Sequence, residues 1–283
     1  MGVAISTTGH EHRLRFLETS VRGWLDNTTL DTSVLVTVDG SATDAQRVAD
    51  TLSLVNDPRL RIYRVGQPEG SGGARLGVAT NKNTGLELLM DSTDARYLFL
   101  SDDDTSPRHP EAIAKFTSLA ESGQDLASHA MVCWGRSRRG ETRNLLASWT
   151  WPRGVMLFQT RSVVERVGGM KEAFGLGGHE HVEWSNRIHA TGFTWKPYIG
   201  PRSHQTEGYT GARRDWFCQD MRQTSESVAS FLSRKAHQTS ISPLRRWDQI
   251  NRVMAESEGD TSFVPYRAAA NGRMSATLVP TNH

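Results

Sequence analysis

The sequence predicts an α/β protein with a mostly parallel sheet and helices on both faces. Three observations indicate this fold class: short apolar runs typical of buried strands, apolar residues at helical spacing between those runs, and polar residues directly after several of them. Because strands that alternate with helices form parallel sheets, the polar strand ends should meet at one edge of the sheet. Ligands of such sheets bind at that edge.

The first 105 residues supply strands and helices in regular alternation. The strands are rich in Val, Ile and Leu, and the helices repeat apolar residues three or four positions apart. We expect strands over residues 3–8, 33–38, 60–65 and 97–100, and helices over residues 12–25, 45–55 and 79–90.

The second half of the chain continues with mixed elements and ends in a basic region. We expect helices over residues 110–122 and 160–167 and near residues 180–190, and strands over residues 127–134, 155–158 and 194–199. The chain then divides into a main domain at residues 1–210, a basic helical appendage at residues 211–255 and a polar, flexible tail at residues 256–283.

Composition indicates an ordinary globular protein. With 283 residues, of which 37% are hydrophobic, the chain can bury a large core. No apolar run approaches the roughly 20 residues that span a bilayer, and residues 1–26 lack the features of a signal peptide, so we expect a soluble protein of the cytoplasm. Two cysteines are too few for a disulfide framework or a zinc site.

Charge is distributed unevenly along the chain. Residues 1–133 hold 12 Lys and Arg against 18 Asp and Glu, whereas residues 134–283 hold 21 against 13. The second half is therefore the part that we expect to meet an anion.

Three successive carboxylates follow the strand at residues 97–100. Asp102, Asp103 and Asp104 would repel one another at a strand end unless a positive charge lies among them. Carboxylate oxygens are the ligands that Mg²⁺ and Mn²⁺ prefer, so the sequence favours a divalent metal site. An Asp-rich turn that caps the next helix is the alternative.

Three segments then carry a family resemblance. They are VDGS at residues 38–41, GVATNKNTG at residues 77–85 and FLSDDD at residues 99–104. In this order they resemble nucleotide-sugar glycosyltransferases of the GT-A fold, a Rossmann-like α/β fold, and in particular the inverting glycosyltransferase family 2. The resemblance implies that residues 1–105 form the nucleotide-sugar-binding half of a catalytic domain and residues 106–210 its acceptor half.

The resemblance also implies roles for individual residues. The Asp of the DGS turn contacts the nucleobase, the second segment lies beside the nucleotide, and Asp102 and Asp104 hold Mn²⁺ or Mg²⁺ on the diphosphate of the donor. Lys82 replaces the usual Arg of the family, which keeps the charge but loses the bidentate geometry. The residues expected to bind the nucleotide sugar are Thr7, Thr8, Asp39, Lys82, Asn83, Asp102 and Asp103.

A fourth segment, FGLGGHEHVEWSNRIHATGF at residues 174–193, is similar to the family sequence that carries the acceptor-activating carboxylate. His181 stands where the family has its catalytic Asp. A neutral imidazole can accept a hydroxyl proton, so His181 could be the base; alternatively Glu180 is the base and His181 orients it. We favour Glu180 slightly. Structurally, Glu183 could simply pair with Arg187 one helical turn later.

Acceptor-binding residues are expected in the second half. Four arginines lie in the loop at residues 135–143 close to tryptophans, and aromatic faces beside cations suit sugars or nucleic-acid bases. The acceptor-binding candidates are Arg136, Arg138, Arg139, Trp151, Glu183 and Trp184. His204 matches the histidine that several GT-A enzymes recruit as a further metal ligand, and a plain loop histidine is the alternative.

The sequence thus predicts a metal-dependent glycosyltransferase that moves a sugar from a nucleotide sugar, with a UDP-sugar expected, to an acceptor hydroxyl with inversion. The acceptor would be a polyanion such as DNA with hydroxylated bases, or a soluble glycan. Two alternatives stay open: a nucleotidyltransferase or sugar-nucleotide pyrophosphorylase, although residues 7–10 lack its glycine-rich basic signature, and a non-catalytic sugar- or nucleic-acid-binding module.

Overall fold

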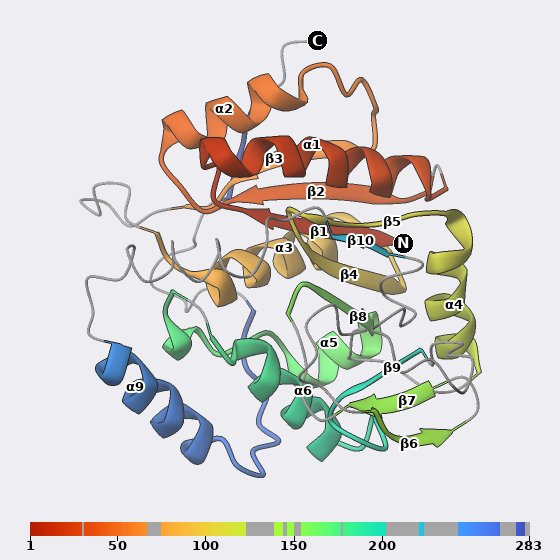
Figure 1. Ribbon diagram of the computed structural model, residues 1–283, viewed down its shortest axis with the longest axis vertical. Helices are drawn as coiled ribbons and strands as arrows, with labels where there is room; N and C mark the ends of the chain where they lie inside the picture. The colour runs from red at the N-terminus through yellow and green to blue at the C-terminus, as the bar shows by residue number, and fades with distance from the viewer. Residues whose placement is uncertain are drawn as a thin grey trace, which may run out of the picture.

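A computed structural model describes the chain over residues 1–29, 31–66, 75–122, 139–143, 146–149, 154–176, 178–201, 221–223, 243–266 and 276–280 (Figure 1). Its centre is a six-stranded sheet in the order β11-β3-β2-β1-β4-β8. The predicted α/β fold class with a mostly parallel sheet is confirmed.

Four strands of this sheet are parallel, and each edge strand runs antiparallel to its neighbour. The parallel strands are β1 (Gly2–Thr7), β2 (Ser33–Val38), β3 (Leu60–Arg64) and β4 (Tyr97–Asp102), and the edge strands are β8 (Met156–Thr160) and β11 (Thr277–Leu278). Strands β1, β2, β4 and β8 are mostly buried because helices cover both faces of the sheet, which explains their largely apolar sequence.

Helices cover the two faces of the sheet through two apolar clusters. On one face lie α1 (Glu11–Asp26), α2 (Ala42–Leu52) and α4 (Pro110–Glu121), and on the other lie α3 (Val78–Ser92), α5 (Arg161–Val167) and α6 (Glu180–Ala190) (Figure 1). The start of α2 is fixed by a capping box in which Ser41 and Asp44 satisfy each other's backbone N–H groups.

The remaining elements are short and lie outside the main sheet. They are β5 (Thr105–Pro107) paired with β10 (Met221–Gln223), the sheet of β6 (Arg139–Arg143), β7 (Leu146–Trp149) and β9 (Ile199–Pro201), the 3-10 turn η1 (Glu172–Phe174), and α9 (Pro243–Glu256). The strand expected at residues 194–199 is instead β9, which begins only at Ile199. None of the helices in the described part of the chain combines the length and apolar character that a membrane crossing requires.

Parts of the C-terminal region lie on the body of the protein. Thr277 and Leu278 extend the sheet beyond β3, and Val264 forms a parallel bridge with Gly168. The sequence predicts a flexible tail from residue 256 because its composition is polar. These contacts are made by the main chain, which composition does not reveal.

Candidate active site

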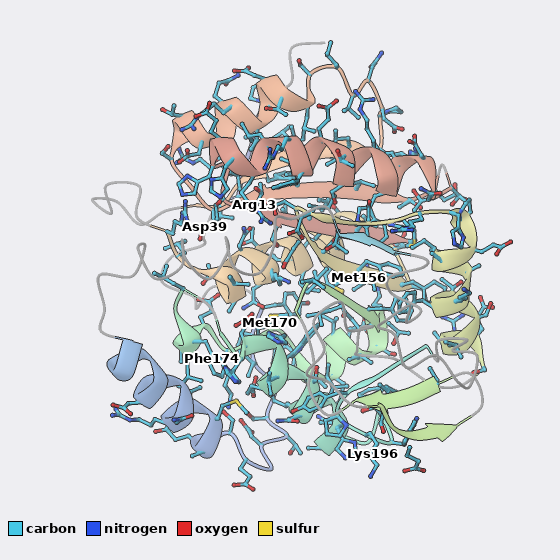
Figure 2. All side chains as sticks on the ribbon, viewed as in Figure 1. Arg13, Asp39, Met156, Met170, Phe174 and Lys196 are labelled. Carbon is cyan, nitrogen blue, oxygen red and sulfur yellow. The ribbon has the colours of Figure 1, made fainter. Side chains whose placement is uncertain are left out.

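The carboxyl ends of β1, β2 and β4 meet at one edge of the sheet, as predicted. Ser6 of β1 lies in register with Thr37 of β2 and with Asp102 of β4. Figure 2 shows Arg13 and Asp39 close together at the end of the sheet toward which β1 and β2 run. The three consecutive aspartates begin at this edge.

The aspartate turn is fixed from the side by α1. Ser20 Oγ donates to the carbonyl of Thr105 at 2.6 Å, and Trp24 Nε1 donates to the same oxygen at 3.0 Å. Both donors lie on the buried face of α1. The sequence of α1 therefore determines where the turn after β4 is held.

The Asp103 side chain is buried and hydrogen-bonded. It is only 3% exposed, and its carboxylate accepts Thr7 Oγ1 at 2.6 Å and Arg13 Nε at 3.0 Å. Thr7 and Asp103 are both expected to bind the donor, and in the structure they are in direct contact. Asp103 is thus held as a bridge between β1, α1 and β4.

Arg13 also reaches Asp104, whose Oδ2 lies 3.2 Å from Nη2. Burial raises the pKa of Asp104 to about 6, partly opposed by Arg13 and reinforced by the charges of Asp103 and Asp102. Sequence reasoning missed Arg13. The available signal was its position in the first turn of α1, because a helix that follows β1 starts at the same sheet edge.

Asp102 is the most open of the three carboxylates, with a side chain that is 33% exposed. Lys82 Nζ lies 2.9 Å from Asp102 Oδ1 and donates to the carbonyl of Gly154, although the Lys82 side chain is only 1% exposed. A buried ammonium is tolerated only when it is paired and hydrogen-bonded. Lys82 therefore ties Asp102 to the loop before β8.

Gly154 in turn lies against His181 at the start of α6. A Cβ on Gly154 would come within 2.9 Å of His181 Nδ1 and 3.0 Å of its Cγ, so the backbone and the imidazole ring are in close contact. Asp102, Lys82, Gly154 and His181 thus form a continuous chain of contacts from the aspartate turn to the α6 N-terminus.

Glu180 and His181 form a pair at the first turn of α6. Glu180 Oε2 accepts the backbone N–H of Gly178 at 2.6 Å, and Glu180 Oε1 lies 3.2 Å from His181 Nδ1. Burial by itself would raise the pKa of Glu180, but the hydrogen bond and charge of His181 and the backbone N–H of Gly178 lower it to about 2. Glu180 is therefore a stable carboxylate that holds the Nδ1 side of the imidazole.

Asp39 is buried and holds the two residues that precede α3. Its carboxylate accepts the backbone N–H groups of Leu76 and Gly77 at 2.8–3.1 Å, and burial raises its pKa. Gly77 has a φ of +115°, and a Cβ there would collide with the carbonyl of Gly175. Asp39 therefore positions the N-terminus of α3 against the loop that leads to α6.

Three predicted site residues are occupied by contacts within the fold. The side-chain amide of Asn83 exchanges two hydrogen bonds with the backbone of Met170, at 2.8 and 2.9 Å. Glu183 pairs with Arg187 at 3.0 Å with both side chains only 1% exposed, and the fully buried Trp184 donates to the carbonyl of Gly168. In this structure these side chains support α3 and α6 and are not open to a ligand.

Several predicted residues lie outside what the structure describes. Arg136, Arg138, Trp151 and His204 fall outside the described residues, and Arg139 is described only as backbone in β6. Thr8 lies at the sheet edge and is partly buried.

The fit of a metal can be judged from the described carboxylates. No three His, Cys, Asp or Glu side chains group as potential ligands in this part of the chain. Mg²⁺ is, however, commonly held by one or two carboxylates together with substrate phosphates. Burial disfavours the charged form of Asp104, so a cation beside Asp104 and Asp102 would stabilise both carboxylates. These two residues therefore suit a cation that is also bound by substrate phosphates.

Comparison with known proteins gives only distant structural matches. No protein-family model matches the chain, and no curated protein matches it. Mannosyltransferase PcManGT from Pyrobaculum calidifontis, solved with GDP-Man and Mn²⁺, aligns with 13% identity and a TM-score of 0.49 over 68% of this chain and 52% of that chain. TarS from S. aureus aligns with 12% identity and a TM-score of 0.47 over 70% and 36%, respectively.

A shorter form of TarS, residues 1–349 in complex with UDP, aligns with 11% identity and a TM-score of 0.44 over 67% of this chain and 54% of that chain. The chain thus spans about half or less of the length of these proteins. PcManGT is a glycosyltransferase by name, the class that the sequence segments resemble.

Proposed function

We propose that this protein is a glycosyltransferase that transfers a sugar from a nucleoside-diphosphate sugar to an acceptor hydroxyl. One observation carries the proposal: contacts from Asp102 through Lys82 and Gly154 to His181 and Glu180 join the aspartate turn to the N-terminus of α6. Transfer requires the residues that bind the donor to lie next to the residues that activate the acceptor.

The donor would lie along the carboxyl ends of β1, β2 and β4, near Thr7, Thr8 and Asp39. Asp102 and Asp104 would hold the divalent cation, and Lys82 supplies a fixed positive charge beside Asp102. When bound, Mg²⁺ or Mn²⁺ neutralises negative charge on the diphosphate. Arg13 keeps the aspartate turn in place by pairing with Asp103 and Asp104.

The acceptor would be activated by the pair at the α6 N-terminus. Glu180 accepts the backbone N–H of Gly178 and lies against His181 Nδ1, so we assign proton acceptance to His181 and orientation to Glu180, against the slight preference for Glu180 in the sequence. Glu180 holds Nδ1, which leaves Nε2 to accept the hydroxyl proton. The acceptor oxygen then bonds to the anomeric carbon while the bond to the diphosphate breaks and its electron pair leaves with the diphosphate.

The acceptor itself stays a prediction of the sequence. A polyanion such as DNA would be bound through the basic second half, and its affinity would fall steeply as salt is raised. A soluble glycan would need only a binding site beside His181. Binding measured to duplex DNA and to neutral glycans at two salt concentrations separates these acceptors.

The function is tested by nucleotide release from a panel of UDP- and GDP-sugars with Mn²⁺. We expect release by the wild type, a loss of at least about a hundredfold in Asp102→Ala, and wild-type rates in Asp94→Ala, a control that removes an exposed acid after α3. Release that is equal in both variants would overturn the proposal, and turnover that requires pyrophosphate would favour a pyrophosphorylase.

A further inference from the structure

The C-terminal arm, defined here as residues 257–266, is attached to the main domain through its backbone. Val264 bridges Gly168 in parallel, Gly169 N donates to Val264 O at 2.7 Å, and Val264 N donates to Val167 O at 3.1 Å. Gly168 has a φ of +79°, and a Cβ there would lie 1.8 Å from Val264 O. Only glycine permits this approach, so the two segments fit each other closely.

The segment that the arm contacts, residues 168–171, is also the support of α6. Trp184 Nε1 donates to the carbonyl of Gly168 at 3.0 Å, and Arg187 donates to the carbonyl of Gly169. Both side chains are buried. Arg187 also donates to the carbonyl of Val167, so α6 is held by three successive carbonyls, and residues 167–169 all pair with the arm.

Residues 168–171 are joined to α3 as well. Met170 exchanges two backbone hydrogen bonds with the side chain of Asn83, the residue after Lys82. Figure 2 shows Met170 and Phe174 on the side of the molecule where α3, α6 and α9 lie. One four-residue segment therefore connects the helix of Lys82, the helix of His181 and the C-terminal arm.

Lys171 adds an electrostatic link between the arm and α6. Its Nζ lies 2.6 Å from Asp260 Oδ2 and 2.7 Å from Ser257 Oγ in the arm, and 3.5 Å from Glu183 Oε1 in α6. The hydrogen bond from Lys171 lowers the pKa of Asp260, which is consistent with a formed ion pair. Lys171 is the second cation beside Glu183, after Arg187. Because Glu183 is only 1% exposed, the charge of Lys171 acts on this carboxylate more strongly than it would at the surface.

From these contacts we infer that the C-terminal arm is a positioning element for the catalytic pair: docking of Val264 and Asp260 on residues 167–171 holds α6 in the orientation that places His181 against Gly154. Among the described residues, no hydrogen bond or ion pair joins the arm to Glu180 or His181, so the arm acts through the segment that α3 and α6 share. The expected effect on catalysis rests on the proposed function, whereas the coupling between the arm and α6 does not.

The first test compares Val264→Pro with Val264→Ala in the full-length protein. Proline removes the N–H that donates to Val167 O, whereas alanine keeps it. Hydrogen exchange of the first two turns of α6, followed by mass spectrometry, should accelerate about tenfold in the proline variant and stay near the wild-type rate in the alanine variant. Unchanged exchange in a folded proline variant overturns the inference.

The second test covers the case in which Val264→Pro does not fold. Lys171→Met removes the ion pair at a partly exposed position, and Lys171→Arg keeps the charge as a rescue variant. We expect faster α6 exchange and a kcat for transfer lowered about tenfold, with the KM for the donor changed less than about twofold, in Lys171→Met alone. Equal loss in Lys171→Arg, or a loss confined to thermal stability, contradicts positioning.

The outcomes also separate this inference from the proposed function. Accelerated α6 exchange in a protein whose wild type has no transferase activity supports the structural coupling and counts only against the proposed function. Normal transfer by the wild type with unchanged α6 exchange and unchanged kcat in Lys171→Met counts only against the arm.

Discussion

Replacing Arg13 by Met should destabilise the protein far more than an ordinary arginine substitution. Arg13 pairs with Asp103 and Asp104, which are 3% and 4% exposed, and the Arg13 side chain itself is 21% exposed. Without the Arg13 cation, two carboxylates stay buried. Asp103 still accepts a hydrogen bond from the hydroxyl of Thr7. Breaking a buried pair in this way costs about 3 kcal/mol.

The matched control is Arg22→Met on the same helix. Arg22 pairs with Glu18 at 3.0 Å, but these side chains are 46% and 39% exposed, so its loss should cost only about 0.5 kcal/mol. Thermal unfolding without metal should show a Tm lower by about 6 °C or more for Arg13→Met, and little change for Arg22→Met. Equal shifts would refute the claim that Arg13 neutralises the aspartate turn.

Two further predictions concern the pair at α6. Gly154→Ala places a Cβ within 3.0 Å of the His181 ring, so transfer should fall at least about tenfold with donor binding retained; unchanged kcat in steady-state assays would contradict the contact. The pKa of Glu180 is lowered from 4.5 to about 2, so its ionised form stabilises the folded state above pH 4.5, and this contribution is lost as the pH falls toward 2. Glu180→Gln should therefore flatten the pH dependence of the unfolding free energy between pH 4.5 and 2, and parallel curves for variant and wild type would refute it.

The sequence predicted the main sheet because its strands and helices are long and periodic. Strands β1, β2 and β4 each bury several consecutive residues, and the alternation of strands with helices along the chain favours the parallel arrangement. Pairing of two- or three-residue strands such as β11 and β5 depends on the folded body next to them and leaves no pattern in the sequence.

The sequence predicted which segments meet at the sheet edge, but not which residues of each helix point toward the site. Asp102, Lys82 and His181 are brought into one chain of contacts, as their segments suggested. Asn83 and Trp184 lie in the same segments, but their helices direct them inward to residues 168–170. Tertiary packing decides which residues of a helix point toward the site. This also explains why Arg13 was missed.

The most direct test of the central claim is calorimetric titration of the wild type and of Asp102→Asn with UDP and with GDP, each with and without Mn²⁺. One nucleotide should bind the wild type only when Mn²⁺ is present, and Asp102→Asn should lose this binding, while Asp94→Asn should keep it. Nucleotide binding of equal strength in all three proteins, or binding that ignores Mn²⁺, would contradict this claim.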